Sequence, residues 1–206
     1  IFGNASKNGI LLKGGRVIEA LANVKAVALD KTGTITSGEF KVQNVETVGS
    51  HVSNAQLLSM ASAIEAVSTH PIATSIVSEA KAQGIVVEAS DFVQELAGEG
   101  MVGTVDGQQV LVGNRRLMER YAVQGYPTEA TEYGTEVLVA EGNVYLGRII
   151  IADEARPDSA EAIANLNGQD IKTVMLTGDA EASANYIAKE TGVSAVRAQL
   201  LPQDKL

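Results

Sequence analysis

An aspartate directly follows a short apolar run near the start of this sequence, and the residues after it suit a phosphoryl group. The run is residues 24–29 (VKAVAL), and residues 30–36 that follow read DKTGTIT. Such a run is typical of a buried strand in a parallel sheet, where ligands gather at the carboxyl ends of the strands. Lys31 offers a positive charge, and Gly33 lets backbone N–H groups approach an anion. The pattern places Asp30 where chemistry on a phosphate can occur.

A carboxylate is a competent nucleophile toward phosphorus once cations shield its approach to a polyanion. Asp30 can therefore form an aspartyl-phosphate, with Lys31 and a Mg²⁺ ion as the shielding charges. The structural alternative is an aspartate that closes a turn, with Thr32 and Gly33 as turn formers. A turn of this kind would be enough to explain an Asp-x-Thr pattern that occurred alone. All seven positions together, however, resemble the phosphorylation motif of P-type ATPases.

Two later segments resemble the same family. Residues 171–176 (IKTVML) are a second candidate for a buried strand and end at Thr177-Gly178-Asp179, so a parallel arrangement would bring Thr177 beside Asp30. The resemblance implies that the Thr177 hydroxyl holds a phosphoryl oxygen and that Asp179 helps to arrange the loop. Residues 201–205 (LPQDK) resemble the segment that carries the family's phosphate-facing lysine, here Lys205. Taken alone, each would be a turn or a solvated charge.

The resemblance also implies a magnesium site and a long-lived phosphoenzyme. Asp30 and the backbone of Thr32 would bind Mg²⁺, with the remaining ligands expected beyond the C-terminus in a Gly-Asp-Gly-x-Asn-Asp motif. The chain by itself is therefore expected to bind ATP but to turn it over poorly. Phosphatases of this catalytic fold resemble an Asp-x-Asp pattern, whose second carboxylate acts as acid and base. Thr32 occupies that position here, and the missing assistance is worth ~10² to 10⁴-fold.

A long insertion between the two strands carries a second set of motifs. It resembles the nucleotide-binding domain of heavy-metal-transporting P-type ATPases in Glu65, His70-Pro71, Gly98-Glu99-Gly100 and Val112-Gly113-Asn114. The resemblance implies that Glu65 and His70 position the adenine. It also implies that Gly98 and Gly100 let the backbone approach the nucleotide, with Asn114 near the same pocket.

Each of these residues also has a structural interpretation. His70 before Pro71 can mark the corner between two helices, because proline favours the first helical position and restricts the residue before it. Gly98-x-Gly100 alone is more often a bulge or a tight turn. Asn114 can be the N-cap of a helix over residues 115–121. The co-occurrence of these motifs with Asp30 is what favours nucleotide binding.

The hydrophobic periodicity predicts an α/β protein with two domains. Helices are predicted at 15–23, 54–66, 71–83, 115–121, 158–167 and 180–191, and strands at 24–29, 40–48, 92–96, 102–105, 110–112, 137–140, 144–151, 171–176 and 193–196. Asp158 with Glu161 is predicted to form a capping box.

The predicted architecture combines a parallel-sheet, haloacid-dehalogenase-like phosphorylation domain with an inserted α+β domain, an antiparallel sheet with helices on one side. Residues 24–37 and 150–206 would form the first domain, incomplete at its C-terminus. Residues 38–149 would form the inserted nucleotide-binding domain, and residues 1–23 a membrane-proximal lead-in.

Composition limits the possible partners. The 206 residues are 45% hydrophobic and 20% charged, as in an ordinary globular protein, and the net charge of −9 argues against nucleic-acid binding. There is no cysteine and no apolar stretch long enough to span a bilayer. The resemblance nevertheless implies the cytoplasmic portion of an integral membrane protein. Its partners would be ATP and the transmembrane and actuator domains of the same pump.

The sequence thus predicts the ATP-binding and phosphorylation region of a heavy-metal-exporting P-type ATPase. The site residues expected to act on the γ-phosphate, together with Mg²⁺, are Asp30, Lys31, Thr32, Thr177 and Lys205. The transported ion is not expected to bind to this chain, although residues 3–15 look more like zinc, cadmium and lead exporters than copper exporters. Two alternatives stay open: a soluble phosphatase with an aspartyl nucleophile and a cap domain, and a nucleotide-sensing module.

Overall fold

The computed structural model describes residues 2–49, 52–90 and 92–205 and divides into two compact units. Unit 1 comprises Ile1–Ile35 and Ala155–Leu206, and unit 2 comprises Thr36–Glu154. The chain passes from one unit to the other after Ile35 and after Glu154, whereas the boundaries predicted from the sequence follow residues 37 and 149. The reason is that β2 (Thr36–Thr47) and β7 (Val144–Ala155) are long strands that belong to the sheet of unit 2 almost throughout.

A buried carboxylate joins the ends of these two long strands. Asp153 in β7 is 7% exposed and accepts hydrogen bonds from the Thr36 hydroxyl and from the Gly38 N–H, the latter at 2.9 Å. Because a buried carboxylate is costly without donors, this cluster fixes β2 against β7 at the border of unit 2.

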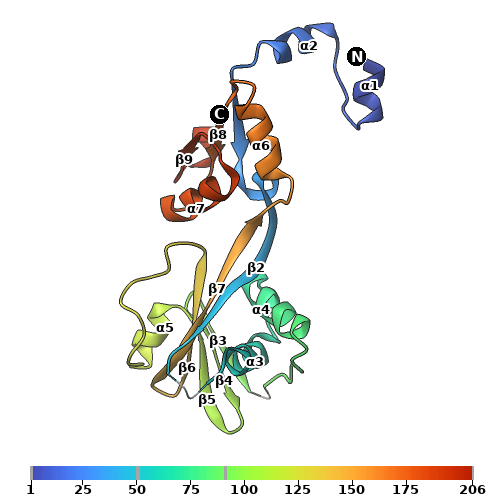
Figure 1. The fold of residues 1–206 in the computed structure, drawn as a ribbon. Helices are drawn as coiled ribbons and strands as arrows, with labels where there is room; N and C mark the ends of the chain where they lie inside the picture. Colours follow the sequence, from blue (N-terminus) through green and yellow to red (C-terminus); the bar gives the residue numbers. More distant parts are fainter. Residues whose placement is uncertain (1, 50–51, 91, 206) are drawn as a thin grey trace. The chain divides into compact units, whose positions relative to one another are not determined.

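Unit 1 contains a parallel sheet of three strands, as predicted (Figure 1). The order is β1 (Ala26–Asp30), β8 (Lys172–Leu176) and β9 (Ala195–Arg197), with parallel pairing throughout. Helices α6 (Ser159–Asn167) and α7 (Glu181–Thr191) pack on it through Ile163, Met175 and Ile187, each at most 2% exposed. The helix α7 ends at Gly192, whose φ of 75° is the left-handed conformation common at helix ends.

The predicted capping box at the start of α6 is wrong. Asp158 has a helical backbone, with φ −93° and ψ −8°, and its side chain makes no capping hydrogen bond. An N-cap side chain can reach the first free N–H groups only from an extended backbone. Instead, the hydroxyl of Ser159 donates to the carbonyl of Ile35 at 2.7 Å, which ties the helix to the end of the loop after β1.

The N-terminal segment forms two short helices, α1 (Phe2–Lys7) and α2 (Gly15–Ala22). Only α2 is predicted by the sequence pattern. Its apolar side chains Val17 and Leu21 are exposed. Within the described ranges, no helix combines the length and the apolar character needed to cross a membrane.

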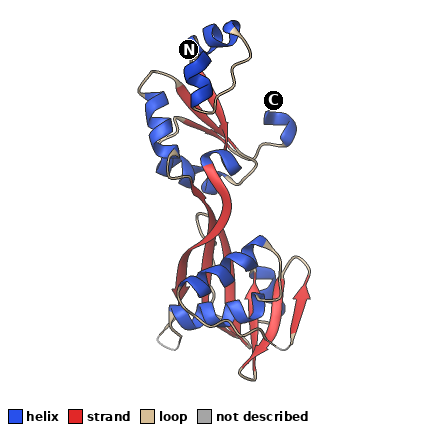
Figure 2. Cartoon of the chain, turned by 90° about the vertical axis from the view of Figure 1, so that its right-hand side faces the viewer, coloured by secondary structure: helices blue, strands red, loops and turns tan. Residues whose placement is uncertain are grey.

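Unit 2 contains a six-stranded sheet, whose strands are drawn in red in Figure 2. The order is β2-β7-β6-β5-β4-β3, and the neighbouring pairs from β3 to β7 are antiparallel, as predicted. Besides β2 and β7, the sheet contains β3 (Val93–Leu96), β4 (Gly100–Val105), β5 (Gln108–Gly113) and β6 (Thr135–Glu141). Asp106 and Gly107, with φ of 51° and 79°, form the hairpin turn between β4 and β5.

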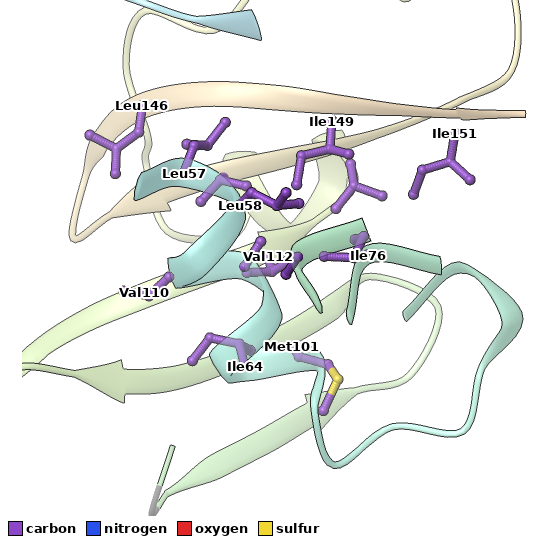
Figure 3. Packing of buried hydrophobic residues seen from close by; sticks show 14 residues of the cluster. Leu57, Leu58, Ile64, Ile76, Met101, Val110, Val112, Leu146, Ile149 and Ile151 are labelled. Atoms are coloured by element: carbon purple, nitrogen blue, oxygen red, sulfur yellow. The ribbon is translucent and has the colours of Figure 1, made fainter. Parts of the chain in front are cut away.

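Both faces of this sheet are covered, so the prediction of helices on one side is wrong. Helices α3 (Asn54–Glu65) and α4 (Pro71–Ala82) pack on the face that carries Val110 and Val112 (Figure 3). The short helix α5 (Arg115–Arg120) buries Leu117 against Leu111 on the opposite face. Alternation along the strands supplies both cores, because successive side chains point to opposite faces. Helix α5 has only six residues, too few for its apolar face to be assigned from periodicity.

Candidate functional site

The strand β1 ends at Asp30, at the carboxyl edge of the parallel sheet. Asp30 lies opposite Leu176 in the pairing of β1 with β8, so Thr177 follows directly on the neighbouring strand. The chain then turns through η1 (Lys31–Ile35), where Gly33 has a φ of 75°. Only glycine adopts that conformation without strain, so the turn depends on this residue. The expected arrangement of Asp30 and Thr177 at one sheet edge is confirmed.

Lys31 and Asp179 connect the two loops at this edge. The Lys31 Nζ lies 2.5 Å from Asp179 Oδ2, and the Lys31 side chain is 5% exposed. Such a partner stabilises a buried ammonium, because burial removes part of the hydration of its charge. Thr177 is also buried, and its hydroxyl oxygen accepts the N–H of Asp179 at 3.1 Å. These contacts hold the Thr-Gly-Asp loop against the loop that follows Asp30.

The remaining predicted site residues of unit 1 are Thr32 and Lys205. Thr32 is exposed and has an extended backbone, with φ −72° and ψ 122°. Lys205 ends η2 (Pro202–Lys205), and its side chain lies outside the described part of the structure. Among the described residues, no group of three or more histidine, aspartate and glutamate side chains is arranged to hold a metal ion. Besides Asp30, the loops at this edge carry the carboxylate of Asp179, which is paired with Lys31.

Unit 2 contains a pocket of about 320 Å³ in which all five predicted nucleotide residues meet. They come from four separate places in the sequence and line the pocket together: Glu65, His70, Gly98, Gly100 and Asn114. The volume is at the lower end of the range for small-molecule sites. Because Glu65, Gly98 and Asn114 lie far apart in the sequence, the fold of unit 2 is what brings them together.

The helices α3 and α4 place the acidic and imidazole groups of the pocket. Glu65 is the last residue of α3 and is 7% exposed. His70 is the N-cap of α4, as its position before Pro71 indicates, and its Nδ1 accepts the N–H of Ile72 at 3.2 Å. An acceptor at Nδ1 leaves Nε2 as the protonated nitrogen of the neutral ring. His70 therefore caps α4 and lines the pocket at the same time.

The glycines Gly98 and Gly100 line the same pocket, together with Asn114. A Cβ on Gly100 would lie 2.3 Å from the carbonyl oxygen of Val112, so the tight pairing of β4 with β5 requires glycine there. The Asn114 Oδ1 accepts from the N–H groups of Arg116 and Leu117, which confirms its role as N-cap of α5. Its Nδ2 donates to the carbonyl of Gly98 at 2.8 Å. Asn114 thus ties α5 to the glycine turn at the rim of the pocket.

A comparison with models of known protein families identifies the family, because one model matches residues from both units. The sequence profile of the haloacid dehalogenase-like hydrolases matches residues 24–206. The chain belongs to this family of hydrolases. The match includes the parallel sheet with Asp30 and the long insertion that carries the pocket, so the predicted fold class is confirmed.

Individual proteins similar to this haloacid dehalogenase-like hydrolase are metal-transporting ATPases. It is 43% identical to a zinc-transporting ATPase of Synechocystis sp. and 40% identical to the cadmium/zinc-transporting ATPase HMA2 of rice, Oryza sativa subsp. japonica, and the alignments cover 99% and 98% of the chain. A crystal structure of a zinc-transporting PIB-type ATPase in the E2.Pi state superposes with a TM-score of 0.87 and 34% identity over 98% of the chain.

The resemblance to heavy-metal P-type ATPases predicted from the motifs is confirmed by these similarities. The chain spans 28% of the Synechocystis protein, 19% of the rice protein and 34% of the crystallised chain. It therefore corresponds to a part of each of these pumps.

Two acidic residues that line the pocket, Glu99 and Glu136, form ion pairs that no sequence pattern indicates. The Arg120 guanidinium donates two hydrogen bonds of 2.6 Å to the Glu99 carboxylate, and they lower the pKa of that carboxyl. Glu136 pairs with Arg115 at 2.7 Å. The partners in both pairs are 21 residues apart. Neither spacing matches a helical or hairpin repeat, so only the tertiary structure reveals these pairs.

We predict that Asn114→Ala destabilises unit 2 by about 1 kcal/mol, because the helix α5 loses its N-cap. The same change removes the donor to the Gly98 carbonyl and should weaken nucleotide binding. Urea unfolding and a nucleotide titration measure the two effects. Asn114→Ser is the matched control, since it restores the cap but is too short to replace the bond to Gly98. An alanine variant as stable as the wild type would contradict the capping role.

Proposed function

We propose that this chain is the nucleotide-binding and phosphorylation region of a heavy-metal-transporting P-type ATPase. The observation that supports this most directly is the convergence of five predicted nucleotide residues on one pocket of unit 2. Independently, unit 1 places Asp30 and Thr177 at neighbouring strand ends. Metal-transporting ATPases are the proteins to which the chain is similar along nearly its whole length.

In the proposed reaction, a carboxylate oxygen of Asp30 attacks the γ-phosphorus of ATP. A new O–P bond forms, the bond from the γ-phosphorus to the β,γ-bridging oxygen breaks, and ADP leaves with that electron pair. Thr177 offers a buried hydroxyl to a phosphoryl oxygen, and Lys205 offers the second cation. Lys31 fixes the two loops through its ion pair with Asp179, which keeps the edge preorganised while its charge stabilises the transferring group.

Magnesium fits the donors that unit 1 presents. Mg²⁺ prefers oxygen ligands and usually binds through one or two carboxylates together with substrate phosphates and water. The Asp30 carboxylate and the backbone carbonyl of Thr32 would be its ligands from this chain. When bound, the ion neutralises charge on the phosphates and lets the anionic nucleophile approach.

The same proposal gives the chain its place in a larger protein. It would be the cytoplasmic portion of a membrane pump, coupled to the transmembrane and actuator domains that move the ion. The selective ligands for the ion would lie in those other parts. Zinc and cadmium are the favoured ions, because the similar proteins of rice and Synechocystis transport them.

Titration of the 206-residue chain with ATP tests this proposal. We expect binding in the pocket, with amide shifts in the NMR spectrum at Gly98, Gly100 and Asn114, and slow or no steady-state hydrolysis. His70→Ala should weaken binding by about tenfold, the equivalent of one lost hydrogen bond or stacking contact. Asp158→Ala, at an 81% exposed aspartate side chain in unit 1, is the control and should bind like the wild type.

Two other results would favour the alternatives. Release of phosphate from p-nitrophenyl phosphate without ATP would support a phosphatase with Asp30 as nucleophile. Tight ATP binding by a full-length protein that never becomes phosphorylated would support a nucleotide sensor.

A further inference from the structure

The carboxyl group of Glu65 lies in a part of the nucleotide pocket that suits a neutral group better than an anion. Glu65 is 7% exposed. The apolar side chains of Ile72, Met101 and Val112 line the same pocket. Transfer of a carboxylate from water into such surroundings costs free energy unless a cation or several donors replace the lost hydration.

No lysine or arginine is among the described residues that line the pocket. Two guanidinium groups lie near its acidic wall residues, but Arg120 is paired with Glu99 and Arg115 is paired with Glu136. None of the ion pairs found among the described residues includes Glu65. A charged Glu65 would therefore face the pocket without a counter-ion from its walls.

The remaining ionisable groups of the pocket are Glu95 in β3 and His70 at the start of α4. Burial, and after it the negative charge of Glu95, raises the pKa of Glu65 to about 7. Helix α3 also packs against β2, β4 and β5. Neither β4 nor β5 carries an ionisable side chain, and none of those on α4 and β2 lines the pocket: Glu39, Lys41, Glu46, Glu79 and Lys81.

We propose that Glu65 binds the adenine ring as a neutral carboxylic acid, donating its O–H to ring nitrogen N1 and accepting from the N6 amino group. This inference rests on the proposed function, which places ATP in the pocket. The Watson–Crick edge of adenine presents one acceptor beside one donor. A neutral carboxyl presents the complementary pair, whereas a carboxylate has acceptors only and would face the N1 lone pair unfavourably.

A binding site that needs a protonated acid loses affinity as the pH rises. Below the pKa of Glu65 the proton is already present, and above it each binding event must take up a proton from solution. The affinity for adenine therefore falls toward tenfold per pH unit above about pH 7.

The test is titration of the 206-residue chain with adenosine from pH 5.5 to 8.5. Adenosine has no phosphate, so ionisation of the nucleotide's phosphates does not contribute. We expect binding to weaken by about tenfold or more between pH 6.5 and 8.5. In Glu65→Gln the amide offers a donor and an acceptor at every pH, so this variant should bind adenosine with a constant affinity.

The analogue 1-deazaadenosine provides a second measurement, because it keeps the amino group and lacks N1. It should bind to the wild type more weakly than adenosine at pH 6.5, with little dependence on pH. Glu95→Gln should move the midpoint of the adenosine profile to lower pH, because it removes the neighbouring negative charge.

Three results would overturn the proposal. One is a wild-type affinity that does not change with pH. Another is a folded Glu65→Gln variant that binds adenosine much more weakly than the wild type at pH 6. The third is a pH dependence that persists in Glu65→Gln, which would show that a group other than Glu65 causes it. If the wild type bound neither adenosine nor ATP at any pH, the proposed function itself would fail, and this inference with it.

Discussion

Replacing Asp30 by asparagine should abolish the transfer of phosphate from ATP to the full-length pump of which this chain is proposed to be a part. The amide nitrogen of asparagine is not a nucleophile, while its size matches that of the carboxyl at the end of β1. We expect the acid-stable label from γ-³²P-ATP to fall by at least about 10³-fold, a size typical of the loss of a covalent nucleophile. Nucleotide binding in unit 2 should be unchanged, because Asp30 is not part of that pocket.

The matched control is Asp158→Asn in the same unit. Its side chain is 81% exposed and caps no helix, so the label should reach the wild-type level. Retention of the label in Asp30→Asn would remove Asp30 from the chemistry and contradict the proposed function.

The second large effect is expected from Gly100→Ala. The added methyl group would lie 2.3 Å from the Val112 carbonyl oxygen and 2.5 Å from the Cα of Gly113. Both are backbone atoms of the paired strand β5, which cannot move without breaking the β4–β5 pairing. A φ of 140° adds strain for any residue with a Cβ. We expect a loss of about 2 to 5 kcal/mol in the free energy of unfolding.

Gly98→Ala is the control for this change, because both glycines line the same pocket. Gly98 also has a positive φ, 73°, but nothing lies within 4 Å of the position that an added methyl group would take. The substitution should therefore cost only about 1 kcal/mol, from backbone strain alone. Urea unfolding followed by circular dichroism compares the two. Equal stability of both variants would show that β4 and β5 do not approach as closely as described.

Local patterns predict much of the fold because they depend on neighbouring residues. Alternating apolar residues and the Asp106-Gly107 turn identify the β4–β5 hairpin, and the apolar runs before Asp30 and Thr177 identify the two parallel strands. Gly192 ends α7 through its own backbone conformation. Each of these features is written within a few consecutive residues.

Features that depend on distant parts of the chain are not predicted by such patterns. The side of the sheet covered by α5 is decided by the packing of Leu117 on Leu111, and the border between the units by Asp153 with Thr36. The sequence predicts a capping box at Asp158, but the Ser159 contact with a distant carbonyl determines the geometry there.

The same distinction between local and distant features applies to the candidate site. Single residues such as Asp30 and His70 are identified through resemblance to a family. That Glu65 shares its pocket with Glu95 and apolar side chains, without a cation among the described lining residues, follows only from the tertiary structure.

Chemical identification of the phosphorylated residue is the decisive experiment for the proposed role of Asp30. The proposed full-length pump is incubated with Mg²⁺ and ATP, quenched in acid and reduced with borohydride, which converts an aspartyl-phosphate into homoserine. Peptide mass spectrometry then locates the modified position. We expect homoserine at residue 30. Phosphate on a serine or threonine, or an unmodified Asp30 in a preparation that binds ATP, would show that Asp30 is not the phosphate acceptor.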